Sequence, residues 1–263
     1  MSAPSLAEVR AGGQPPGLKE RRNEEHWAGR LYMRSISPFF SWIFIRIGFS
    51  PNQLTYMMIV CGMLGGVAVA VDGRGTAGLV WAIVGAVLIQ AYLLLDCSDG
   101  EVARFRNRTS ITGVYLDRIG HYLSEVALLA GLGVRAQGAW ENGGYVELGL
   151  LAALGAALIK AETDNVVVAR AKSGLPADPE SGDRALRPES TGLALAREAA
   201  SLLKLHRIIG AVELSLLIVV AAVIDHLTHD LTATRVLAVA VAVVAVLQTG
   251  LHFVSIVASR RLK

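Results

Sequence analysis

Three aspartates and a histidine stand at helical spacing between residues 96 and 121. Asp96 and Asp99 are three residues apart and share one face of a helix. Asp117 and His121 are four residues apart, which again places both side chains on one face. Carboxylates at the edge of an apolar segment are costly as bare anions, and a hard divalent cation bound through oxygen offsets that cost. We therefore predict a metal site, presented by two neighbouring helices.

Small residues and an arginine accompany this cluster. Gly100 follows Asp99 directly, and Ala103 lies about one turn further along nearly the same face, which leaves room for a ligand near the backbone. Arg104 adds a fixed cation whose planar guanidinium suits bidentate contact with phosphate. The segment therefore predicts a phosphate-bearing substrate beside the metal.

The chain as a whole is too apolar for an ordinary soluble domain. It is 53% hydrophobic and 18% charged over 263 residues, with a mean hydropathy of +0.47. Its apolar residues form blocks near the roughly 20 residues that cross a bilayer. These blocks cover residues 52–71, 76–95, 114–134, 146–169, 208–224 and 233–257. We predict an all-α polytopic membrane protein with six transmembrane helices.

The basic residues are distributed unevenly between the two sides of this arrangement. Arg74, Arg135 and Arg235 follow blocks one, three and five, whereas nearly all other lysines and arginines lie at the opposite side. By the positive-inside rule, both termini and the metal cluster face the cytoplasm. We expect a plasma membrane of bacterial type.

Three regions are expected along the chain. Residues 1–25 are rich in glycine, proline and charge, and we predict a disordered tail. Residues 26–49 interleave aromatic residues with arginines, which suits an amphipathic helix in the headgroup layer. A short helix packed on the protein's own loops is the alternative. Residues 50–263 form the transmembrane catalytic domain, with a cytoplasmic loop at 173–204 whose second half is predicted to be an amphipathic helix.

The first apolar block carries a face of small residues, Gly62, Gly65 and Gly66. Such a face allows close helix contact either inside one bundle or across a dimer seam. Both interpretations are open at this point, and we expect a homodimer as the assembly.

The central segment resembles the signature of the CDP-alcohol phosphotransferase family, D-x2-D-G-x2-A-R-x8-G-x3-D-x3-D. The residues that match it are Asp96, Asp99, Gly100, Ala103, Arg104, Gly113 and Asp117. The run SPNQLT at residues 50–55 is similar to the T-P-N-x-x-T run at the start of the family's first span. The chain departs from the family at His121, where a fourth aspartate is usual.

The resemblance implies transfer of a phospho-alcohol group from a CDP-alcohol to an acceptor hydroxyl, with release of CMP and formation of a phosphodiester, in phospholipid or polyol-phosphate synthesis. It implies Mg²⁺ or Mn²⁺ as cofactor, and a CDP-alcohol donor, a lipid or polyol acceptor and membrane lipids as partners, without nucleic acid. The implied metal ligands are Asp96, Asp99, Asp117 and His121, with His121 also the general base. The implied nucleotide and phosphate contacts are Asn52, Thr55, Gly100, Ala103, Arg104 and Gly113, and those for an acceptor or lipid phosphate are Lys160, Arg170 and Arg207.

His121 is the residue on which activity depends most. A neutral imidazole accepts a proton near pH 7 and can also bind a metal, so the role of base is compatible with this change. The number of metal ions stays open, and Glu125, one turn further, could orient His121 or replace the missing carboxylate. Lys160 either pairs with Asp164, four residues on, or contacts phosphate.

Two other functions fit the same residues. One is a catalytically impaired family member that acts as a non-enzymatic membrane protein, and the other is a transporter, to which buried carboxylates alone would also point. Within the enzymatic interpretation, the donor is either CDP-diacylglycerol or a CDP-linked headgroup. The long N-terminal arm favours the second.

Overall fold

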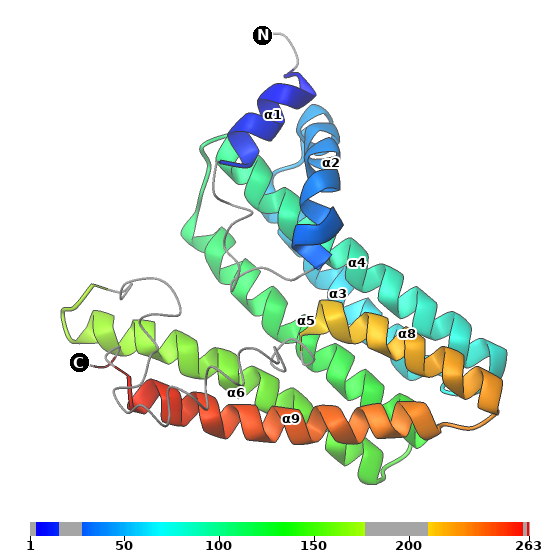
Figure 1. Cartoon of the computed structure of the whole chain (residues 1–263). Coiled ribbons are helices and arrows are strands. Elements are labelled where there is room, and N and C mark those ends of the chain that lie inside the picture. The colour runs from blue at the N-terminus through cyan, green and yellow to red at the C-terminus, as the bar shows by residue number, and fades with distance from the viewer. Residues whose placement is uncertain (1–3, 16–27, 177–209, 260–261, 263) are drawn as a thin grey trace.

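A computed structural model describes residues 4–15, 28–176, 210–259 and 262, and the secondary structure of this part is helical (Figure 1). The elements are α1 (Leu6–Gly13), η2 (Gly29–Met33), α2 (Arg34–Arg46), α3 (Pro51–Val71), α4 (Gly75–Phe105), α5 (Ile111–Gln137), α6 (Gly144–Lys172), α8 (Ala211–Thr228) and α9 (Thr232–Val257). Six long helices, α3 to α6 with α8 and α9, fall on the six predicted apolar blocks. The prediction of an all-α polytopic membrane protein is confirmed.

Five of these helices, α3, α4, α6, α8 and α9, are long and apolar enough to cross a membrane. The remaining long helix, α5, has 27 residues and carries Asp117 and Arg118 in its first half and Glu125 just past its midpoint. These charges lower its hydropathy. The helix that departs most from a simple membrane span is thus one of the two that carry the predicted metal ligands.

The start of α3 follows from local sequence. Ser50 caps the helix by accepting a hydrogen bond from the backbone N–H of Gln53, and the Gln53 side chain accepts in return from the Ser50 backbone. Pro51 occupies the first turn, where its missing N–H costs nothing. The SPNQLT run therefore fixes where the first span begins.

Helix α3 packs against both α4 and α5, and its glycines make this close approach possible. Gly66 lies against the backbone of Ala127 and Gly131 on α5. On the α4 side, a Cβ atom added to Gly85 would lie only 3.0 Å from the carbonyl oxygen of Gly65. All three predicted glycines are buried. Of the two interpretations of this face, packing inside one bundle is the one found.

The prediction of disorder for residues 1–25 is wrong for residues 6–13, which form α1. Ser5 and Glu8 form a capping box that starts the helix. Val9 and Gly13 are buried, and Gly13 lies directly against Glu101 of α4. Composition alone missed this helix because the surface that buries it belongs to a distant part of the chain. Much of the remaining tail lies outside the described residues.

Within residues 26–49, the structure describes η2 and α2, which lie with α1 over one end of α4 (Figure 1). Ser37 and Ser41 of α2 are fully buried toward α4, whereas Phe39 is 48% exposed and stacks on Trp42. The helix thus packs on the protein through one face and offers an aromatic face outward. Its place in the headgroup layer stays a prediction.

Tyr32 of η2 ties this arm to the bundle through a hydrogen bond from its hydroxyl to Gln90 Oε1 at 2.6 Å. Burial, with Glu213 nearby, raises the pKa of Tyr32, so the phenol remains protonated as the donor. The amphipathic helix predicted in the second half of loop 173–204 lies outside the described residues.

Candidate metal centre

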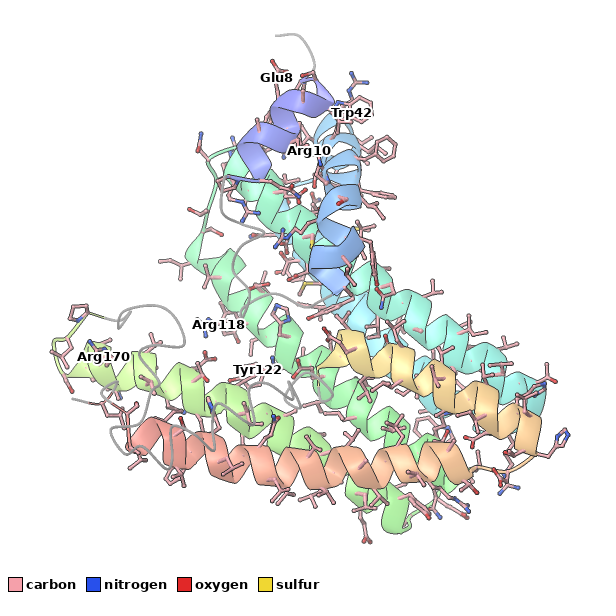
Figure 2. All side chains as sticks on the ribbon, in the orientation of Figure 1. Glu8, Arg10, Trp42, Arg118, Tyr122 and Arg170 are labelled. Carbon is pink, nitrogen blue, oxygen red and sulfur yellow. The ribbon has the colours of Figure 1, made fainter. Side chains whose placement is uncertain are left out.

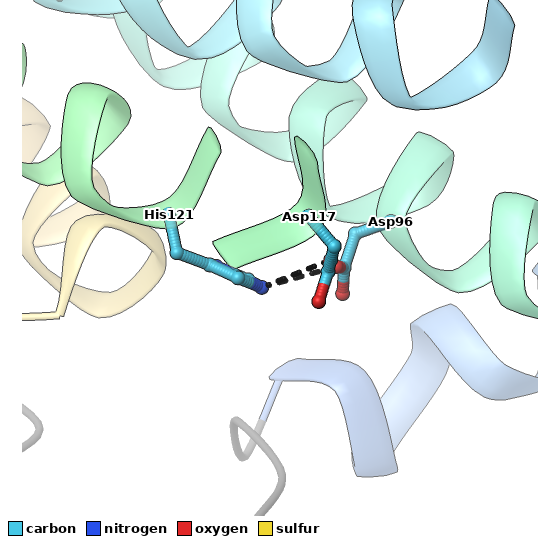
Figure 3. A group of neighbouring side chains, drawn as sticks. All are labelled: Asp96, Asp117 and His121. Atoms are coloured by element: carbon cyan, nitrogen blue, oxygen red, sulfur yellow. Dashed lines mark ion pairs between the residues drawn. The ribbon is translucent and has the colours of Figure 1, made fainter. Parts of the chain in front are cut away.

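Asp96, Asp117 and His121 converge on one point (Figure 3). Asp96 comes from α4 and the other two from α5; the short loop 106–110 joins these helices, and both pack on α3. His121 Nε2 lies 3.3 Å from Asp96 Oδ1 and 3.5 Å from Asp117 Oδ1. One ligand atom from each residue lies within 4.8 Å of the other two. Two carboxylate oxygens and an imidazole nitrogen at this spacing fit a divalent cation.

The cluster is open to a ligand. The side chain of Asp117 is 43% exposed, that of His121 26% and that of Asp96 21%. Groups with this exposure keep coordination positions free for a substrate, unlike a closed structural site. The donor set and its access therefore suit a cation that handles a bound molecule.

Asp99 is not one of the three converging residues and is hydrogen-bonded to α3. The residue is only 8% exposed, and its carboxylate accepts a hydrogen bond from Thr55 Oγ1 at 2.6 Å. Thr55 is therefore linked to the cluster by its hydrogen bond to Asp99. The spacing of residues in the sequence does not predict this contact, because the two residues lie on different helices. Asp99 stays a predicted ligand, one turn from Asp96 on the same helix.

Arg104 lies across Gly100. A Cβ atom added to Gly100 would lie 3.1 Å from Arg104 Nη1, so the absence of a side chain at Gly100 gives the guanidinium room in this place. Arg104 Nε also donates to the carbonyl oxygen of Gly13 at 2.7 Å. The end of α1 thus holds one edge of the guanidinium.

The other predicted nucleotide and phosphate residues lie around the same two helix ends. Gly113 donates its N–H to the Ser110 cap at the start of α5. A Cβ atom added there would lie 3.2 Å from Asn52 Oδ1 of α3. Ala103 is half-buried on α4. The structure therefore brings Asn52 to Gly113, while the binding of a nucleotide by these residues stays a prediction.

The polar residues inside α6 pair across to α5. Lys160 Nζ lies 3.1 Å from Glu125 Oε1. Asp164 forms an ion pair with Arg118 and accepts a hydrogen bond from the Tyr122 hydroxyl at 3.1 Å. The suggested Lys160–Asp164 pair is therefore wrong, because each side chain meets an opposite charge on the neighbouring helix.

Figure 2 labels Arg118 and Tyr122 on α5 and Arg170 toward the end of α6. Arg170 Nε donates to the carbonyl oxygen of Pro176 at 3.0 Å. Arg207, the third candidate for an acceptor or lipid phosphate, lies outside the described residues. The phosphate roles of Lys160, Arg170 and Arg207 remain predictions.

Two residues near the cluster escaped the sequence reasoning. The hydroxyl of Tyr92 is hydrogen-bonded to His121 Nδ1, with the two rings edge to face at 86°. Glu101 is 1% exposed and accepts hydrogen bonds from Ser37, Ser41 and Gln14. The available signal for Tyr92 was its place four residues before Asp96, on the same helix face.

Comparisons with known proteins found similarity to a family model and to a curated relative. Residues 49–219 match the model of the CDP-alcohol phosphatidyltransferase family, which is more than half of the chain. A protein of Aquifex aeolicus (strain VF5) described as a bifunctional IPC transferase and DIPP synthase is 30% identical over 93 residues. That segment is 35% of this chain and 20% of the Aquifex protein, so the chain aligns with about a fifth of that relative's length.

Proposed function

The chain belongs to the CDP-alcohol phosphatidyltransferase family, and from this we propose that it transfers a phospho-alcohol group from a CDP-alcohol to an acceptor hydroxyl. The phosphorus–oxygen bond to CMP breaks, a new phosphodiester forms with the acceptor oxygen, and CMP leaves. The observation that carries the proposal is the convergence of Asp96, Asp117 and His121 in an accessible site at the signature spacing.

We propose Mg²⁺ or Mn²⁺ as the cofactor, held by Asp96, Asp117 and His121, with Asp99 adjoining. A divalent cation bound there would offset the negative charge of the diphosphate and of the departing CMP. Thr55 limits the movement of Asp99 through its short hydrogen bond. Arg104 adds a second positive charge, since its guanidinium lies over Gly100 beside the cluster.

His121 provides a nitrogen lone pair at the cluster. Its Nε2 atom faces Asp96 and Asp117, whereas Nδ1 is engaged by Tyr92. Nε2 can either bind a cation or accept the proton of the acceptor hydroxyl. Both roles use the same lone pair, so Nε2 serves them one at a time.

We propose a lipid or polyol acceptor and a CDP-linked headgroup as the donor, in phospholipid or polyol-phosphate synthesis. The description of the Aquifex relative as an IPC transferase and DIPP synthase supports a transfer reaction of this kind. The charged pairs between α5 and α6 supply polar groups near the cluster, among them Lys160. CDP-diacylglycerol as donor is the alternative.

The charge distribution supports a bacterial-type plasma membrane with both termini and the metal cluster on the cytoplasmic side. We also propose a homodimer. Since the glycine face of α3 is used inside the bundle, its seam would lie elsewhere.

The test is CMP release by the purified protein with a panel of CDP-alcohols and either cation. Asp117→Asn and Asp96→Asn should each lower the rate at least 100-fold, because each removes a charged ligand at the reacting phosphate. Asp72→Asn, in the turn between α3 and α4, is the matched control and should retain activity. Failure to release CMP from any donor would favour a non-enzymatic membrane protein or a transporter, and full activity of Asp117→Asn would refute the metal assignment.

A further inference from the structure

On the side of the imidazole away from the two carboxylates, the hydrogen-bond partner of His121 is a tyrosine. Tyr92 lies one turn before Asp96 on α4, and its hydroxyl is hydrogen-bonded to His121 Nδ1. The ring centroids are 5.7 Å apart at 86°, so the imidazole is held by ring packing as well as by the hydrogen bond. Both nitrogens of the imidazole are therefore accounted for: Nδ1 by Tyr92 and Nε2 by the two carboxylates.

Tyr92 is in a rigid position. It is 2% exposed, and a Cβ atom added to Gly62 of α3 would lie 3.1 Å from its Cδ2 atom. The missing side chain at Gly62 leaves room mainly for Ser124 of α5, and one edge of the tyrosine ring also lies against it. A buried phenol requires a partner for its hydroxyl, and His121 provides it.

A phenol differs from the usual second partner of a metal-binding histidine, which is a carboxylate or a carbonyl oxygen. Those groups only accept, so they fix the proton on Nδ1. A tyrosine hydroxyl both donates and accepts. It can donate to Nδ1 while Nε2–H faces Asp96 and Asp117, and it can accept from Nδ1–H when Nε2 uses its lone pair.

We infer that Tyr92 is a positioning residue for His121, which holds the imidazole in place while its single proton moves between Nε2 and Nδ1. When a divalent cation takes up Nε2, the Tyr92–His121 hydrogen bond reverses its direction, the ring stays where it is, and the imidazole is neutral in both tautomers. When Nε2 instead accepts the acceptor proton, the ring becomes an imidazolium, and its Nδ1–H still donates to the Tyr92 hydroxyl. The inference deepens the proposed function and rests on it for the nature of the ligand at Nε2.

The first test reads the tautomer directly. In protein with ¹⁵N-labelled histidine, the His121 signals are identified among the six histidines by their loss in His121→Asp. At constant pH, addition of Mg²⁺ should convert His121 from the Nε2–H to the Nδ1–H form. An unchanged tautomer in protein that binds the cation would overturn the inference.

The second test measures Mn²⁺ affinity by electron paramagnetic resonance in Tyr92→Phe, which keeps the ring and removes only the hydroxyl. Loss of a group that orients a metal ligand weakens binding about 10- to 100-fold, and we expect at least tenfold. Tyr32→Phe, which removes a hydroxyl bonded to Gln90, is the control and should bind within twofold of wild type.

A third variant separates positioning from packing. In the His121→Asp background, Tyr92→Phe should change Mn²⁺ affinity less than twofold, because no imidazole is left to orient. Equal losses in both backgrounds, or an unchanged affinity of Tyr92→Phe alone, would make Tyr92 a packing residue only. Failure of the proposed function is distinct, since it appears as a wild-type protein that binds no Mn²⁺ or releases no CMP.

Discussion

Glu101 is expected to hold the N-terminal arm onto the bundle, and its removal should release that arm. The carboxylate is 1% exposed. It accepts hydrogen bonds from Ser37 and Ser41 at 2.6 Å each and from Gln14 Nε2 at 2.8 Å. Arg34 Nη1 lies 3.7 Å away. One buried side chain thus joins α1 and α2 to α4.

The size of the effect follows from these contacts. A hydrogen bond to a charged group contributes about 1.5–3 kcal/mol, so the three bonds give an upper bound of roughly 4–9 kcal/mol. Part of this free energy is recovered in Glu101→Ala, because the two serines can donate instead to the backbone carbonyl four residues earlier in their helix. Gln14 keeps a partner as well, since its side chain also donates to the Arg34 carbonyl oxygen. We expect a loss of about 3–5 kcal/mol, the range for a buried ionic group deprived of its partner.

Hydrogen–deuterium exchange measures this loss where it occurs. A cost of about 3 kcal/mol corresponds to roughly 100-fold more frequent opening, so amides of α1 and α2 should lose about that much protection. Protection in α9 should stay unchanged. Glu147→Ala, which removes an exposed carboxylate from the first turn of α6, is the matched control. Protection of α1 and α2 within threefold of wild type in Glu101→Ala would refute the reasoning.

Three further outcomes are expected. Gly66→Ala should destabilise the protein by about 1–3 kcal/mol in a thermal melt, since the new Cβ meets the backbone of Ala127. In the control Gly250→Ala the new Cβ meets open space, so equal melting temperatures of the two variants would contradict the packing described. Thr55→Val should weaken Mn²⁺ binding about tenfold, because Asp99 loses its hydrogen bond, and an unchanged affinity would remove Asp99 from the site. Chelation by EDTA should abolish CMP release and Mn²⁺ should restore it; activity that survives chelation would exclude the proposed cofactor role.

Much of the fold was predictable because its signals are local. The apolar blocks predicted the six long helices, and the Ser50–Gln53 capping box with Pro51 marked the start of α3. The spacing of Asp117 and His121 placed both side chains on one helix face, as found. Such features depend on residues within a turn or two, where backbone geometry alone decides which side chains are neighbours.

Only the tertiary structure decided which helix meets each of those faces. Spacing along α6 suggested that Lys160 pairs with Asp164, yet both meet residues of α5. Composition suggested that residues 6–13 are disordered, yet they form a helix whose Gly13 packs on Glu101 of α4. The sequence determined the helices and the chemistry of the cluster, because both follow from local order and residue type. The arrangement of the helices decided that Thr55 holds Asp99 and Tyr92 holds His121, because these contacts join residues far apart in the chain.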